Sequence, residues 1–233
     1  LPNLIRVSVL TIVTGFCTYP KTGKGGLDWD KEEVANLITH GFGVIASAMG
    51  LGFLIYFAVQ YGTIWEQVSF GLFGITMLMV FLASTIYHTI RNPKWKSLFQ
   101  TIDQSAIFLL IAGSYAPFCL VSMRGPWGWS IFSLVWVLAI SGIILKIYFR
   151  DTVVKPFLFL YVIMGWICVI ATNKMLETIP DFSLIFIGVG GAFYMVGIIF
   201  FLWEKLPYNH AIWHIFVLGG CASHYVAVLD LIL

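Results

Sequence analysis

The chain has 233 residues, of which 60% are apolar and only 10% charged, and its formal net charge is +2. Soluble domains carry about 25% charged side chains, so a soluble domain of this length could not bury so much apolar surface. With a mean hydropathy of +0.93, the composition indicates a polytopic membrane protein. It excludes a secreted disulfide scaffold, a disordered regulator and a basic nucleic-acid-binding protein.

The first 31 residues differ from the rest of the chain. Residues 1–18 are apolar but are interrupted by Asn3, Arg6 and Ser8, and residues 19–30 are polar. This pattern predicts an interfacial helix or linker over residues 1–31, followed by a membrane domain over residues 32–233.

The remaining chain divides into long apolar stretches. A helix that crosses the hydrocarbon layer needs about 20 largely apolar residues. Stretches of this kind cover residues 34–59, 67–89, 98–121, 129–147, 155–173, 182–203 and 210–230. The separators, including residues 91–96 and 173–181, are rich in proline, glycine or charge and are predicted to be loops. The sequence therefore predicts an all-α fold, a bundle of seven transmembrane helices.

The basic residues predict the orientation of this bundle, because cytoplasmic loops of membrane proteins carry an excess of Lys and Arg. The side opposite the amino terminus receives only Arg124 and Lys174. The side of the amino terminus receives Lys21, Lys24, Lys31, Arg91, Lys94, Lys96, Lys146, Arg150, Lys155 and Lys205. We therefore expect a cytoplasmic amino terminus and a carboxyl terminus outside. In a bacterium the membrane would be the plasma membrane, whereas for a eukaryotic source the sequence indicates no organelle.

Polar residues within the spans are few, and nearly all lie toward the predicted cytoplasmic ends. An ionisable side chain inside a bilayer costs about 2.5–3.5 kcal/mol, so each one marks a candidate functional site. At about 1.5 Å of rise per residue, most of them reach one depth just inside the inner interface. They are Glu33, Asn36, His40, Ser84, His88, Asp103, His210 and His214, and His224 lies further along the seventh span.

Three of the histidines have the chemistry of a metal site. His210 and His214 share one helix face at i, i+4, a spacing that can hold a metal without distorting the backbone. His88 reaches the same depth from another helix. Three neutral imidazoles suit Zn²⁺ and leave a fourth position for water, as in catalytic zinc sites. On spacing and depth alone, these histidines could also make ordinary polar contacts at the membrane interface.

Asp103 and Ser84 are candidate catalytic residues. Asp103 is the only carboxylate well inside an apolar span, where it could accept a hydrogen bond from a zinc-activated water or act as its base. The Ser84 hydroxyl could hold the water or a developing oxyanion, or it could donate to the carbonyl of Val80 in its own helix.

The other polar residues are predicted to have supporting or structural roles. Glu33 lies where it would interact favourably with the helix dipole, and Asn36 could form interhelical hydrogen bonds. For His40 and His224, we expect contacts with the headgroup region or hydrogen bonds between helices.

These residues also carry a family resemblance. The pattern comprises Glu33-x-x-Asn36-x-x-Thr39-His40, Ser84-x-x-x-His88, Asp103 within residues 101–118, RGPWGW at 124–129, HAIWH at 210–214, and His224-Tyr225. Over residues 32–230 the chain resembles the hemolysin III type membrane proteins of the progestin and adiponectin receptor superfamily. The resemblance implies seven helices with the amino terminus inside. It also implies a zinc held by His88, His210 and His214 near the cytoplasmic face, with Asp103 reaching the zinc-bound water and Ser84 close by.

The resemblance also suggests a function. Family relatives include alkaline ceramidase-like enzymes, which implies zinc-dependent hydrolysis of an amide or ester bond in membrane lipid homeostasis. The expected partner is a membrane lipid, either ceramide or another acyl lipid, and no nucleic acid. A lipid can reach a metal below the headgroups laterally, more easily than a polar solute can. Two alternatives stay open: a non-enzymatic receptor or regulator with structural zinc, and a pore-forming cytolysin, as the hemolysin name implies.

Overall fold

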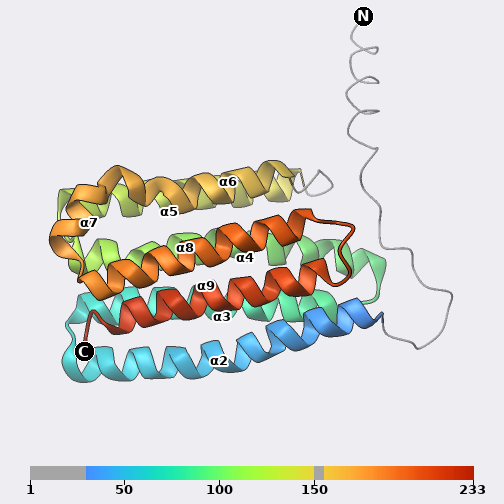
Figure 1. Cartoon of the computed structure of the whole chain (residues 1–233), viewed down its shortest axis with the longest axis horizontal. Helices are drawn as coiled ribbons and strands as arrows, with labels where there is room; N and C mark the ends of the chain where they lie inside the picture. The colour runs from blue at the N-terminus through green and yellow to red at the C-terminus, as the bar shows by residue number, and fades with distance from the viewer. Residues whose placement is uncertain (1–29, 150–154) are drawn as a thin grey trace, which may run out of the picture.

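The computed structural model describes residues 30–149 and 155–233, in which helices run back and forth as a bundle (Figure 1). The helices are α2 (Lys31–Tyr61), α3 (Ile64–Thr89), α4 (Pro93–Pro117), α5 (Pro126–Tyr148), α6 (Lys155–Trp166), α7 (Thr172–Thr178), α8 (Asp181–Leu202) and α9 (Asn209–Leu229). Within the described ranges, seven helical spans are long and apolar enough to cross a membrane, which confirms the predicted all-α, seven-span fold. The segment predicted over residues 1–31 lies outside the described residues except for Asp30 and Lys31, and the orientation stays a prediction.

Two predicted loops are partly helical. The third span begins at Pro93 because Asn92 caps it: the Asn92 side chain accepts the N–H of Lys94 at 3.0 Å, and proline suits the first helical position. In the predicted loop 173–181, α7 continues the fifth span to Thr178. Its polar residues include good helix formers, among them Lys174 and Glu177, whose side chains pair at 3.1 Å.

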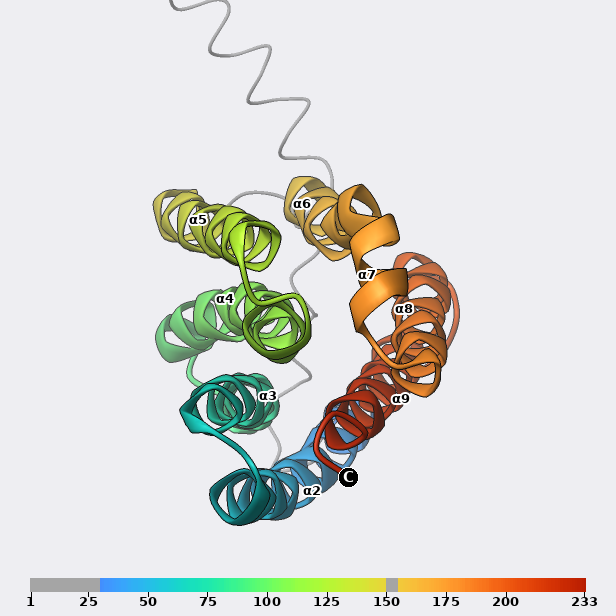
Figure 2. The ribbon, with the colours of Figure 1, turned by 90° about the vertical axis from the view of Figure 1, so that its left-hand side faces the viewer.

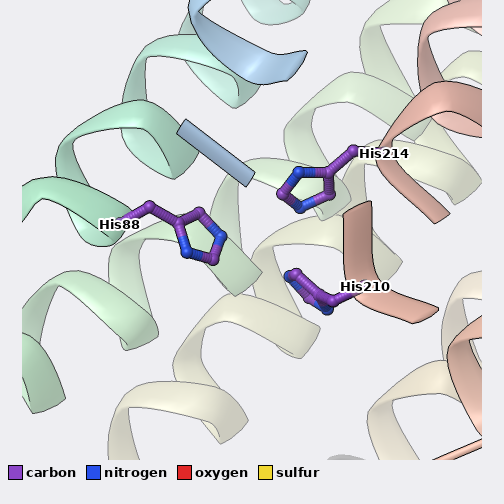
Figure 3. Close-up of side chains that lie close together, drawn as sticks. All are labelled: His88, His210 and His214. Atoms are coloured by element: carbon purple, nitrogen blue, oxygen red, sulfur yellow. The ribbon is translucent and has the colours of Figure 1, made fainter. Parts of the chain in front are cut away.

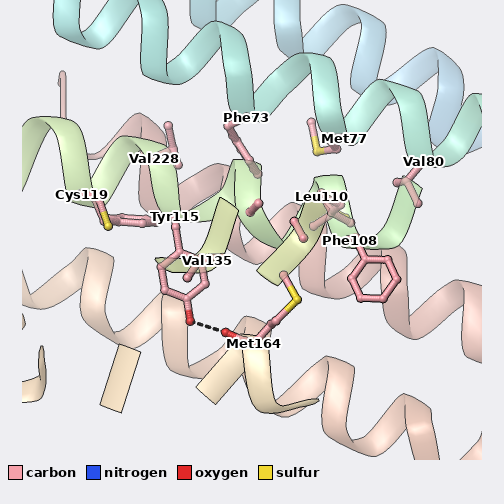
Figure 4. Close-up of a cluster of buried hydrophobic side chains, with 14 of the residues drawn as sticks. Phe73, Met77, Val80, Phe108, Leu110, Tyr115, Cys119, Val135, Met164 and Val228 are labelled. Atoms are coloured by element: carbon pink, nitrogen blue, oxygen red, sulfur yellow. Dashed lines mark hydrogen bonds between the residues drawn. The ribbon is translucent and has the colours of Figure 1, made fainter. Parts of the chain in front are cut away.

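Two spans contain non-α turns that one side chain connects. The third span ends in a π-helical turn, η2 (Phe118–Ser122), directly after Pro117, and the fifth contains a 3₁₀ segment, η3 (Ile167–Ala171). The Tyr115 hydroxyl donates to the carbonyl of Met164 at 2.8 Å (Figure 4) and accepts the N–H of Cys168 at 3.1 Å. These bonds satisfy backbone groups that the change of helix type leaves without helical partners, as a lipid environment requires.

The spans enclose a central cavity. Viewed end on, α2, α3, α4 and α5 lie along one side, and α6, α8 and α9 return along the other until α9 meets α2 (Figure 2). The most buried spans are those of α3 and α4, which contribute fully buried phenylalanines such as Phe73 and Phe108. All seven spans contribute residues to a cavity of about 490 Å³ between the two sides.

One of the basic residues counted for the orientation is buried inside the bundle. Lys146 is only 2% exposed, and its ammonium group lies 4.8 Å from the centre of the Phe157 ring. Its alkyl stem and its cation–π contact let it remain inside the bundle.

Candidate metal centre

Three histidines from two helices meet at one end of the bundle (Figure 3). His88 lies in the last turn of α3, and His210 and His214 lie in the first two turns of α9. One ring nitrogen from each lies within 4.8 Å of the other two, so the group could hold a metal ion. Because α3 runs toward the end of the bundle at which α9 begins, the fold brings the three predicted ligands together.

The hydrogen bonds of His88 indicate which of its ring nitrogens is available. Nδ1 lies 2.5 Å from Oε2 of Glu33, whose other oxygen accepts from the Lys96 ammonium at 2.9 Å. Nε2 is buried and has no hydrogen-bond partner among the described residues. Metal-binding histidines commonly donate their second ring N–H to a carboxylate, which orients the ring and raises its basicity. In His88, therefore, Nε2 is the atom positioned to bind a cation.

His214 is oriented in a similar way by a hydroxyl group. Its Nδ1 lies 3.1 Å from Oγ1 of Thr39, and that hydroxyl donates its own proton to the backbone carbonyls of Ala35 and Asn36. With the hydroxyl proton directed to these carbonyls, Oγ1 accepts from His214 Nδ1–H. The neutral ring then has its lone pair on Nε2.

The position of His210 is set by the turn that precedes α9. Tyr208 adopts a left-handed conformation with φ of 58°, unusual for a residue other than glycine. Its N–H donates to the Glu32 carboxylate at 2.9 Å, and the Asn209 side chain donates to the carbonyl of Phe201 at 3.2 Å. The first turn of α2 and the end of α8 together hold this turn in place.

The two candidate catalytic residues lie on the wall of the cavity that His210 and His214 also line. Asp103 comes from α4, and Ser84 from α3 one turn before His88. The hydroxyl oxygen of Ser84 is buried, makes no hydrogen bond of normal geometry in the described part of the chain, and lies close to the Asp103 carboxylate. The alternative in which Ser84 donates to Val80 is therefore not the arrangement seen.

His40 and Asn36 differ from expectation. His40 is only 4% exposed, and its ring stacks on His214 with 3.5 Å between ring centroids. Neither ring nitrogen of His40, nor the side-chain oxygen of Asn36, has a hydrogen-bond partner among the described residues. The expected headgroup contact of His40 is thus wrong, and its helix-to-helix contact is ring stacking. Asn36 does not form the expected interhelical bond through its oxygen.

Three residues that organise this centre were not predicted from the sequence to belong to it. Thr39 orients His214, Lys96 binds Glu33, and Glu32 holds the turn before His210. For Lys96 the sequence did contain a signal. Lys96 and Glu33 lie at the starts of two spans on the same side of the bundle, where a cation and a carboxylate can pair. Thr39 belongs to the family pattern, but nothing in the sequence indicated its partner, and for Glu32 no signal existed, because both partners lie more than 170 positions away along the chain.

The fold and site define a multi-span membrane protein with a potential metal site at one end of its helical bundle. The chain belongs to the Haemolysin-III related family, whose sequence profile matches residues 29–225. It is 47% identical over 203 residues to Hemolysin-3 of Bacillus cereus, covering 87% of this chain and 93% of that protein. It is 46% identical over 201 residues to the Hemolysin-3 homolog of Bacillus subtilis, with 85% and 93% covered.

A more distant similarity extends to a human protein. The chain is 29% identical over 206 residues to the monocyte to macrophage differentiation factor of Homo sapiens, covering 84% of this chain and 83% of that protein. No solved structure matches the chain. The predicted membership of the hemolysin III family is confirmed, and the human relative supports the wider superfamily.

Replacing Glu33 with glutamine should weaken metal binding by roughly 10-fold to 100-fold, the usual cost of losing a carboxylate behind a ligand histidine. Glutamine retains an oxygen that can accept from His88 but removes the charge that Lys96 neutralises. Competition with a chromogenic chelator measures the affinity. Glu177→Gln, which alters only an exposed ion pair, is the control and should leave the affinity unchanged. Equal affinities in Glu33→Gln and wild type would contradict this role.

Proposed function

We propose that the protein is a zinc-dependent hydrolase that cleaves an amide or ester bond of a membrane acyl lipid and thereby takes part in lipid homeostasis. One observation carries the proposal: a histidine group able to hold a metal lies at one end of a long apolar cavity, with a carboxylate and a neighbouring hydroxyl on the cavity wall.

The donor set suits zinc. Zinc accepts neutral imidazole nitrogens and is commonly held by three protein ligands when its fourth position serves catalysis. The orphaned, buried Nε2 of His88 and the lone pair inferred on Nε2 of His214 are such donors, and His210 completes the set. When bound, zinc supplies a Lewis acid that brings the pKa of a water molecule close to neutrality.

Side chains of the protein would transfer the proton of the attacking water and stabilise the developing charge. In the proposed reaction, the oxygen of the attacking water bonds to the acyl carbon while Asp103 accepts a proton from that water. The carbon–nitrogen or carbon–oxygen bond then breaks, and Asp103 returns the proton to the leaving amine or alcohol. Ser84 donates a hydrogen bond to the acyl oxygen as negative charge develops there. The products are a fatty acid and an amine or alcohol.

The cavity supports an acyl chain as the bound group. Along α4 its wall extends from Asp103 to Tyr115 and continues to Phe118, a helical rise of about 22 Å. Away from the histidine end, most of the lining side chains are apolar, among them Leu110, Met195 and Val217. Its volume of about 490 Å³ lies within the range of about 300–1,000 Å³ typical of small-molecule sites.

A non-enzymatic receptor or regulator is the second candidate, and one observation favours it. A metal at the histidine group would join α3 to α9, and the bonds of Glu33 and Thr39 extend this network to α2 and α4. Such a metal would stabilise the bundle without any reaction. A pore-forming cytolysin is less well supported, because a cavity wall this apolar does not suit an aqueous channel.

The test is fatty-acid release by purified protein in vesicles that contain ceramide or glycerophospholipid. We expect zinc-loaded protein to release fatty acid, chelation to stop the release, and added zinc to restore it. If chelation lowers the thermal midpoint but no lipid is cleaved in any state, the hydrolase is excluded and the structural role of zinc is favoured.

A further inference from the structure

The cavity contains a second polar feature, His224, far from the histidine group. His224 lines the same cavity, and neither of its ring nitrogens makes a hydrogen bond of normal geometry with the described residues, although the backbone carbonyl of Ile187 in α8 lies close to the ring. The ring of Tyr194 lies edge-on at 5.4 Å, but its hydroxyl donates to the sulfur of Cys221 and is not directed to the imidazole. The cavity wall therefore does not fully use the hydrogen-bonding capacity of the His224 ring.

A hydroxyl group on α4 also lines the cavity, at a similar helical rise from the end where the three histidines lie. From His214 to His224, α9 rises about 15 Å, and from Asp103 to Ser114, α4 rises about 16 Å. Both His224 and Ser114 line the cavity. Ser114 donates to the carbonyl of Ile111 at 2.8 Å, which leaves lone pairs on its oxygen. Tyr115, next in the chain, uses its hydroxyl on the backbone of the fifth span.

The backbone of α8 leaves room for the His224 ring. A Cβ atom built on Gly190 would lie only 2.6 Å from Nε2 of His224, so any larger residue would displace the imidazole. Gly191, the next residue, has no atom within 4 Å of such a Cβ. The His224 ring thus packs directly against the backbone of α8 at Gly190, where the absence of a side chain permits this approach.

These features point to a ligand that supplies the missing hydrogen bonds. Leaving a buried polar group without a full set of partners is unfavourable, and a neutral imidazole offers one donor and one acceptor. We propose that His224 and Ser114 form a subsite for a hydroxyl group carried partway along an acyl chain. The inference rests on the proposed acyl-chain cavity. In this cavity, the subsite selects acyl chains whose hydroxyl group lies at a particular distance from the acyl end, which is held at the histidine group.

The experiment measures binding, not turnover. Full-length protein in nanodiscs is loaded with a fluorescent fatty acid, which is then displaced by stearic acid or by hydroxystearic acids that differ only in hydroxyl position. We expect one intermediate position to bind roughly 5-fold to 10-fold more tightly than stearic acid, the worth of one or two hydrogen bonds. A flat series, or a series in which no acid displaces the probe, overturns the proposal.

Variants assign the preference to His224. His224→Phe keeps an aromatic ring but cannot form the hydrogen bonds, so it should lose the positional preference and still bind stearic acid as wild type does. Gly190→Ala, which displaces the ring, should lose the preference too, whereas the adjacent Gly191→Ala should keep it. A preference that persists in His224→Phe overturns the assignment.

The outcomes separate this subsite from the proposed hydrolase. If the positional preference is present but no lipid is cleaved, only the hydrolase fails. If fatty acid is released but wild type binds all positions equally, only the subsite fails. Metal content, measured on each variant, should equal that of wild type because His224 lies outside the histidine group.

Discussion

Replacing His214 with alanine should reduce bound metal to a trace and lower the thermal midpoint of the protein. The substitution removes one of three nitrogens that could hold the ion, together with the ring that stacks on His40. It also leaves the Thr39 oxygen without the ring N–H that it accepts. Two remaining imidazoles on α3 and α9 cannot hold zinc tightly, because zinc sites generally use three or four protein ligands.

Elemental analysis of the purified variant measures this effect, with His224→Ala as the matched control. Both substitutions remove a histidine from α9 and from the wall of the same cavity, but only His214 belongs to the candidate metal group. His224→Ala should therefore retain the wild-type metal content. Equal metal contents in the two variants would exclude the assigned ligand set.

Replacing Asp103 with asparagine should reduce fatty-acid release by at least about 100-fold while metal binding persists, since a positioned general base contributes roughly 10²–10⁴-fold. Asparagine has nearly the same shape but cannot accept the proton of the attacking water. Asp103 is not among the three candidate ligands, so the metal content should not change. Release rates at saturating lipid, with elemental analysis of the same samples, measure both quantities.

Ser105→Ala is the control for this substitution. Ser105 lies two positions further along α4, and its buried hydroxyl has no hydrogen-bond partner among the described residues. Removing an unpaired hydroxyl costs little, so release should stay near the wild-type rate. Undiminished release by Asp103→Asn would remove Asp103 from the reaction. Loss of metal in that variant would instead assign it a role in binding the ion.

The fold could be predicted because the bilayer imposes simple requirements on sequence. Seven apolar stretches of sufficient length correspond to seven spans, with errors only where helix-forming polar residues extend a helix beyond its apolar part, as in α7. The interruptions within spans were not predicted. The 3₁₀ segment η3 depends on the Tyr115 hydroxyl from another span, and no local pattern reveals that contact.

The identity of the residues in the candidate site could be predicted from sequence more completely than the contacts between their side chains. Depth along each helix placed His88, His210 and His214 together, because distance from a charged loop is readable from sequence. Side-chain direction is not readable in this way. The stacking of His40 on His214 and the pairing of Glu33 with His88 depend on how α2 is rotated against its neighbours.

The contact between α2 and α9 has a consequence for biosynthesis. The bonds of Glu32 to the turn before α9 and of Thr39 to His214 join the first described span to the last. Such long-range contacts form late, since the intervening chain must first be ordered. The histidine group therefore cannot assemble until the seventh span has been inserted. Metal would enter only completed molecules, and its presence would distinguish mature protein from partly inserted chains.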